Sequence, residues 1–134
     1  MAFKYLQPAG WAPPRGYTNG IMADGVSIFV SGQIGWTGKQ VFETDDFVGQ
    51  LEQTLRNVVA VLAEAGAEPE HVVRLTWFIT DKHDYLARQE EVGLAYRRVM
   101  GRRFPTMSVV QVAALMEDRA KVEIEATAVI PRLR

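Results

Sequence analysis

The sequence predicts an α+β domain in which two helices cover one face of a mixed β-sheet. The 134 residues are 48% hydrophobic and 23% charged, the balance of one compact domain, and they contain no repeat or low-complexity tract. Segments with strand and helix patterns follow one another in the order β-β-α-β-α-β-β. We therefore expect one domain over residues 1–134, with residues 1–16, rich in Pro and Gly, as an N-terminal arm.

The first strands are expected at residues 17–22 and 26–31, with a further short strand near Phe3. Asp24-Gly25 separates the two longer runs, and Asp-Gly between β-prone runs favours a tight hairpin. Asn19-Gly20 is a rival turn, but it leaves the preceding strand almost no length. The sequence thus predicts a hairpin around Asp24-Gly25.

An amphipathic helix is predicted within residues 44–66. Thr44 or Asp45 can cap its start, and Gly66 supplies the left-handed residue that commonly ends a helix. Its apolar positions fall three or four apart and form one stripe: Phe47, Leu51, Leu55, Val58, Leu62 and Ala65.

The second half of the chain predicts a strand over 71–80, a helix over 82–100 that Gly101 ends, and strands over 106–112 and 121–130. The first of these strands is apolar on both faces, as in the middle of a sheet. The last alternates, with Val122, Ile124, Ala126, Ala128 and Ile130 on one face and Lys121, Glu123, Glu125 and Thr127 on the other. Because both helices are expected on one face, we expect another copy of the chain to bury the opposite face.

Composition excludes several classes of function. Cysteine is absent, which removes disulfides, thiol nucleophiles and zinc or iron–sulfur sites that need thiolates. His71 and His83 stand alone, so no metal site is expected. The net charge of −1 gives no overall field for a nucleic acid, and no apolar run is long enough to predict a membrane span. The start also lacks a signal-peptide pattern, so the expected compartment is the cytoplasm.

Few residues suggest a nucleophile or a phosphate site. None of the serines, Ser27, Ser31 and Ser108, lies in a G-x-S-x-G elbow, and the glycines at 32, 35 and 38 do not form a phosphate-binding loop. The basic residues within 97–103 can contact phosphates, but at the end of a helix they more simply complement the helix dipole.

Two polar groups remain as candidates. Ser31-Gly32-Gln33 ends a buried strand and either forms a turn or offers free backbone donors. Glu123 and Glu125 lie about 7 Å apart on one strand face. They form a solvated face or, if an oligomer buries them, carboxylates with raised pKa values that can orient or activate water.

Several of these pieces occur in an order that resembles the Rid family, the YjgF/YER057c/UK114 group. The resemblance covers Tyr17 to Ile130. It is carried by Gly16-Tyr17, the strand IFV running into Ser31-Gly32-Gln33-Ile34, Gln53, the segments LRNV at 55–58 and LAEAG at 62–66, Phe104-Pro105, and VEIEA at 122–126.

The resemblance implies a chorismate-mutase-like fold and a homotrimer whose three sheets form a central barrel, with clefts between subunits. It also implies hydrolysis of small enamines or imines to a keto acid and ammonia, without a cofactor. Glu123 is then the residue that positions the attacking water. Tyr17, Ser31, Gly32, Gln33 and Val109 are the matching substrate-binding positions, together with Met107.

Two positions depart from the family pattern. Deaminating members hold the substrate carboxylate with an arginine where this chain has Met107, and they carry an asparagine where it has Gly93. A thioether cannot hold an anion, so we predict a substrate that is larger or less acidic than 2-aminoacrylate. Arg102, Arg103 or an arginine of a neighbouring subunit are alternative anion clamps.

Three functions follow. The first is a Rid-like deaminase, and the second is a non-catalytic ligand-binding or interaction trimer, favoured by the loss of the arginine and asparagine together. Endoribonuclease activity ranks last, since the chain has no pair of histidines and no positive net charge.

Overall fold

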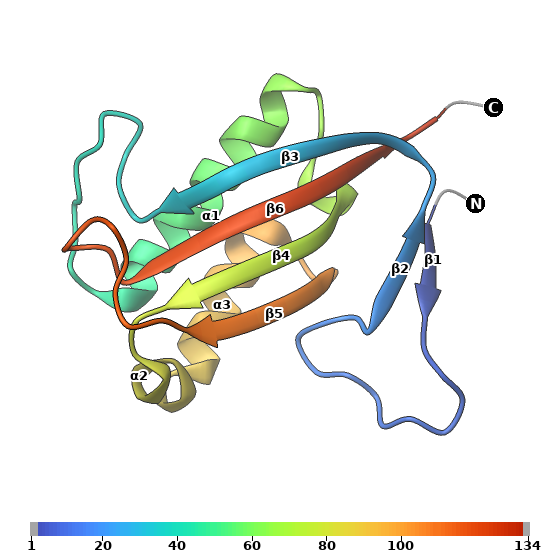
Figure 1. The fold of residues 1–134 in the computed structure, drawn as a ribbon, viewed down its shortest axis with the longest axis horizontal. Coiled ribbons are helices and arrows are strands. Elements are labelled where there is room, and N and C mark those ends of the chain that lie inside the picture. Colours follow the sequence, from blue (N-terminus) through green and yellow to red (C-terminus); the bar gives the residue numbers. More distant parts are fainter. Residues whose placement is uncertain (1–2, 133–134) are drawn as a thin grey trace.

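The computed structural model describes residues 3–132 and shows a sheet covered on one face by helices (Figure 1). The four-stranded sheet has the order β3-β6-β4-β5, with β3 Gly25–Ile34, β6 Val122–Pro131, β4 Val72–Ile79 and β5 Thr106–Gln111. β6 pairs antiparallel with β3 and β4, whereas β4 and β5 are parallel, so the predicted mixed sheet is confirmed. None of the described helices is long and apolar enough to span a membrane.

The helices are α1 (Phe47–Glu64), α2 (Lys82–Ala87) and α3 (Gln89–Met100), and a 3₁₀ turn (Pro69–His71) precedes β4. Helices α1 and α3 lie behind the sheet in Figure 1, so the prediction of helices on one face is confirmed. The single helix predicted over 82–100 is wrong, because the chain leaves helical geometry at Arg88. The Arg88 guanidinium binds Asp46 at 2.8 Å and Glu91 at 2.7 Å, a tertiary contact that helical spacing does not reveal.

The predicted N-cap of α1 is also wrong. Asp46, not Thr44 or Asp45, accepts the hydrogen bond from Gly49 N at 3.0 Å. Gly66 adopts φ of 74° and follows the end of the helix, as predicted. Ala65 lies beyond the helix and is exposed, so it is not part of the buried stripe.

The predicted hairpin at Asp24-Gly25 is wrong. β2 (Gly20–Ala23) pairs antiparallel with β1 (Phe3–Leu6), and these two strands form a separate small sheet. The short strand near Phe3 is thereby confirmed. A Cβ at Gly25 would fall on the carbonyl oxygen of Ile130, so this glycine permits close approach of β3 to β6 instead of a turn.

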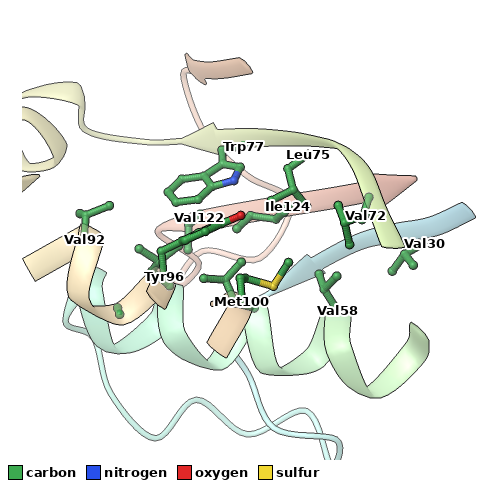
Figure 2. Close-up of a cluster of buried hydrophobic side chains, with 14 of the residues drawn as sticks. Val30, Val58, Val72, Leu75, Trp77, Val92, Tyr96, Met100, Val122 and Ile124 are labelled. Atoms are coloured by element: carbon green, nitrogen blue, oxygen red, sulfur yellow. The ribbon is translucent and has the colours of Figure 1, made fainter. Parts of the chain in front are cut away.

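The core fills the space between the sheet and the helices (Figure 2). Fully buried side chains from the strands, including Leu75 and Ile124, meet the stripe of α1 and the inner face of α3. Tyr96 and Met100 come from α3 and lie below Trp77 of β4 in Figure 2. The apolar positions of α1 that are buried are Phe47, Leu51, Leu55, Val58 and Leu62, as the spacing predicted.

The other face of the sheet has no helix over it (Figure 1). The alternation of β6 is confirmed, since Ile124 and Ala126 are buried under the helices while Glu125 is exposed. Phe29 of β3 lies opposite Thr127 of β6 and is 78% exposed. We call this surface the open face.

Candidate functional site

Helix α1 fixes the end of β3 through two amide side chains. Asn57 Nδ2 donates to the carbonyl oxygens of Ile34 at 3.0 Å and Trp36 at 2.7 Å, and Gln53 Nε2 donates to Asn57 Oδ1 at 2.9 Å. Because α1 is packed into the core, these hydrogen bonds fix the position of the C-terminal end of β3 relative to the helix.

Ser31-Gly32-Gln33 is not a strand-ending turn, because β3 continues to Ile34. The pairing with β6 shifts register between Val30 and Gln33, which is a bulge. Gln33 Nε2 donates to the Ser31 carbonyl oxygen at 3.0 Å. Bulges often mark functional positions because they redirect the neighbouring groups.

Glu123 of β6 lies against this bulge. A Cβ built on Gly32 would sit 2.2 Å from Glu123 Oε2, so only glycine leaves room for the carboxylate in this position. Glu123 is partly exposed, whereas Glu125 is exposed on the same face. Four predicted site residues therefore lie together around the bulge, namely Ser31, Gly32, Gln33 and Glu123. We call them the open-face cluster because Glu123 lies on the open face.

The other predicted residues line a cavity of about 560 Å³ between β5, α3 and the segment before β2. Thr18 holds this segment in place, since its backbone N–H donates to the Pro105 carbonyl oxygen at 3.0 Å. We call the cavity the edge pocket. Its walls include Tyr17, Trp77, Tyr85, Gly93, Tyr96, Phe104, Met107 and Val109.

The open-face cluster and the edge pocket lie on opposite sides of the sheet within one chain. Met107 is in register with Leu75, whose side chain is buried under the helices. Glu123 is in register with Phe78, on the open face. A single chain thus does not bring Glu123 together with Met107.

Aromatic side chains from β4, α2, α3 and the segment before β5 make up much of the pocket wall. The rings of Tyr96 and Phe104 stack with centroids 5.2 Å apart, and Tyr85 meets Trp77 edge-on at 6.3 Å. Burial raises the pKa of the Tyr96 hydroxyl, which donates to the Arg103 carbonyl oxygen at 3.3 Å. Their helical and strand spacing predicts burial but does not distinguish a packed core from a cavity wall.

The arginines at this pocket also differ from those that the sequence suggested. Arg15 and Arg97 line the pocket, whereas Arg102 and Arg103 do not. Among residues 3–132, no group of three or more histidine or acidic side chains is arranged to bind a metal ion.

Known proteins are similar to this chain in sequence. The family model described as endoribonuclease L-PSP matches residues 9–130. A RutC family protein of Synechocystis is 34% identical and covers 98% of this chain and 99% of its own. A Salmonella typhimurium protein named 2-iminobutanoate/2-iminopropanoate deaminase is 35% identical, covering 78% of this chain and 80% of its own.

Solved structures agree. A Rid family protein from Yersinia pestis superposes with a TM-score of 0.82 at 28% identity, covering 97% of this chain and 100% of its own. Escherichia coli TdcF with bound serine gives a TM-score of 0.69 at 32% identity, covering 95% and 98%.

The mixed sheet with helices on one face, a glutamate seated on a glycine bulge and an aromatic pocket at the sheet edge define a small α+β protein of the YjgF fold. This chain belongs to the Rid family, in agreement with the resemblance of its sequence motifs.

Proposed function

We propose that the protein hydrolyses a reactive imine or enamine metabolite to a carbonyl compound and ammonia. The observation that carries the proposal is the carboxylate of Glu123 held against Gly32, on a face of the sheet that no helix covers. The name of the Salmonella relative, a deaminase of imino acids, supports the reaction class.

Glu123 supplies the proton transfers of this reaction. Its carboxylate accepts a proton from a water molecule, and the water oxygen adds to the carbon of the C=N bond while the nitrogen gains a proton. The resulting carbinolamine loses ammonia and leaves a C=O bond. The atoms balance with water as the sole co-reactant, so neither a metal ion nor an organic cofactor is required.

A complete site requires more than one chain in this proposal. Glu123 and the edge pocket lie on opposite sides of the sheet, and the open face carries the exposed ring of Phe29. Packing of a second copy against that face would bury Phe29 and set the Glu123 of one chain beside the edge pocket of another. The homotrimer with a central barrel, implied by the family resemblance, is the assembly we propose.

The substrate differs from 2-aminoacrylate in this proposal. Met107 stands at the position of the family's carboxylate-binding arginine, and its side chain packs against the core. A thioether offers no charge and no hydrogen-bond donor to a carboxylate. Substituting Met107→Arg should therefore raise turnover of 2-aminoacrylate, measured as ammonia release from material formed in place by a dehydratase.

The role of Glu123 is tested by substituting Glu123→Gln. Ammonia release from a panel of imines, generated in place by amino-acid oxidases, should fall by a factor of about 10² to 10⁴. Glu125→Gln, on the same face two residues away, is the matched control and should retain activity. Equal activity of the Glu123 variant and the wild type would contradict the proposal.

The shared site is tested by mixing two variants. Glu123→Gln and Tyr17→Ala disable different halves of the proposed cleft. If the cleft lies between subunits, unfolding and refolding the two inactive variants together should restore part of the activity, because some mixed assemblies contain one intact site. Failure to recover activity, when mass measurement shows that mixed assemblies have formed, would contradict a cleft shared between subunits.

A second candidate is a binding protein on the same fold. The replacement of both the arginine and the asparagine, by Met107 and Gly93, favours it. An inert imine panel together with saturable binding of a small molecule would support this candidate. Cleavage of RNA has no comparable support, since the net charge is −1.

A further inference from the structure

Helix α1 carries a fully buried amide whose hydrogen bonds reach the strand that holds Glu123. Gln50 has no exposed surface. Its Nε2 donates to the carbonyl oxygens of Thr44 at 3.1 Å and Arg119 at 2.9 Å, and its Oε1 accepts from the Lys121 N–H at 2.8 Å. Both N–H groups and the oxygen of the amide are therefore paired, which fixes its orientation. Because Lys121 directly precedes β6, Gln50 fastens the start of that strand to the helix.

The pairing between β3 and β6 is short at this end of the sheet. The bulge interrupts the ladder of hydrogen bonds between the two strands. Between the bulge and the end of β3, the strands are in register at Gln33–Ile124 and Ile34–Glu123. A ladder of this length restrains its strands less than a continuous one does. The distance from the Glu123 carboxylate to Gly32 therefore depends on further contacts that hold the two strand ends.

The same helix holds the end of β3. Asn57 donates to two carbonyl oxygens there, and Gly35, directly after the strand, packs against the helix backbone. A Cβ built on Gly35 would lie 2.5 Å from the Cβ of Gln50 and 2.9 Å from its Cα. Helix α1 thus contacts both strands that form the site, β3 with Gly32 and β6 with Glu123. A shift of either strand end relative to the other would change the contact between the carboxylate and the bulge.

We propose that Gln50 and Asn57 are positioning residues for Glu123. Gln50 locates the start of β6 and Asn57 locates the end of β3, so that the carboxylate keeps its place against Gly32. The helix that carries both amides is anchored in the core, and Gln50, without exposed surface, does not touch a substrate. This inference rests on the proposed function, because it concerns the placement of the carboxylate that activates water there.

Steady-state kinetics of Gln50→Met test the role of the buried amide, since methionine keeps the length of the side chain and makes none of its hydrogen bonds. We expect kcat for imine hydrolysis to fall about tenfold and KM to stay within a factor of about two, because the carboxylate moves while the edge pocket stays in place. Thr54→Val is the matched control. Thr54 is equally buried on α1, but its hydroxyl donates within the helix, to the Gln50 carbonyl oxygen at 2.7 Å. Both variants should unfold at lower urea concentration, and an equal loss of kcat in the two would overturn the proposal.

A double substitution separates positioning from a general loss of stability. Gly32→Ala displaces the carboxylate directly, because the added methyl group takes its place. If Gln50 acts through the position of that carboxylate, adding Gln50→Met to Gly32→Ala should lower kcat by less than about twofold more, whereas independent effects would multiply. Multiplied effects in the folded double variant would overturn the proposal.

Nuclear magnetic resonance tests the placement of Glu123 without any turnover. The signals of the Gly32 amide and of the Glu123 side-chain carboxyl carbon should shift in Gln50→Met and in Asn57→Ala and should keep their wild-type positions in Thr54→Val. Circular dichroism establishes that each variant is folded, and the Asn57 variant tests the proposal by itself if Gln50→Met does not fold. Unchanged signals in a folded variant of either residue would overturn the proposal. The expected shifts, with no ammonia release from any imine by the wild type, would instead contradict the proposed function and leave the positioning of Glu123 by α1 standing.

Discussion

β6 contributes to both faces of the sheet, and the two sets of side chains have different surroundings. Toward the helices, Val122, Ile124 and Ala128 are fully buried in the core. On the open face, Glu123 is seated on Gly32 and Glu125 faces solvent. Alternate residues of one strand thus serve stability and, in our proposal, assembly and catalysis. Substitutions at adjacent positions of a strand should therefore affect different properties, namely stability on the covered face and activity or assembly on the open face.

The largest effect is expected on the covered face. Leu75→Ala removes a side chain with no exposed surface and should lower the free energy of unfolding by about 2–5 kcal/mol. Thr76→Ala, the next residue and on the open face, should change it by less than about 1 kcal/mol. Urea unfolding followed by circular dichroism measures both, and similar losses would break the distinction between the faces.

The next largest effect is expected on activity, at the contact between Glu123 and Gly32. Gly32→Ala places a methyl group where the carboxylate lies, so the Glu123 side chain has to move. We expect the rate of imine hydrolysis to fall by about tenfold or more, since displacing a catalytic group by an ångström has costs of this order. Gly38→Ala, with no atom near its added Cβ, is the control. Unchanged hydrolysis in the Gly32 variant would show that this contact does not position the carboxylate.

A smaller effect on stability, with a clear effect on assembly, is expected at Phe29. Because the ring is 78% exposed in the single chain, Phe29→Ser should change the stability of a separated subunit by only about 0.5 kcal/mol. In the proposed trimer the same ring is buried, so association should weaken. Sedimentation over a range of concentrations measures this, and an unaltered mass would show that Phe29 lies outside the interface.

The smallest effect is expected at the edge of the covered side. The Arg88 guanidinium, followed by the Gly49 N–H, lowers the pKa of the Asp46 carboxyl below its ordinary value. A lowered folded pKa means that the contribution is present above the unfolded pKa and is lost as the pH falls through the folded one. Asp46→Asn keeps a capping side chain, but the free energy of unfolding should then decrease less steeply as the pH falls.

Since Asp46 is about half exposed, we expect this contribution to be below about 1 kcal/mol. Unfolding in urea at a series of acidic pH values, compared with Asp45→Asn, provides the measurement. An unchanged slope in the Asp46 variant would show that Arg88 does not stabilise the ionised form.

The spacing of apolar residues predicted correctly those elements whose burial depends on their own local sequence. The stripe of α1 and the alternation of β6 have direct burial consequences, and both appear as predicted apart from Ala65. The hairpin failed because the partner of β2 lies in the arm, a pairing that Asp24-Gly25 does not encode. The continuous helix predicted over 82–100 also failed, because the chain leaves helical geometry at Arg88, and the contact of its guanidinium with Asp46 is not visible in the local spacing.

For the candidate site, the family resemblance predicted one site, and the structure places Gly32 and Glu123 in contact. Within one chain, however, Tyr17, Met107 and Val109 line a cavity on the opposite side of the sheet. Sequence reasoning did not reveal that Trp77 and Arg97 line the edge pocket. One looks like an ordinary core residue and the other like an ordinary helix-end cation until the space around them is known.

The anchoring of Thr18 to Pro105 has an evolutionary consequence. Tyr17 reaches the edge pocket from a segment that contributes no residue to the buried core, whereas Met107 reaches it from the sheet. Mutations within residues 3–20 can therefore change one wall of the pocket without altering a residue of the buried core. Such a division lets related chains diverge in ligand preference through their least constrained segment, at little risk to the scaffold.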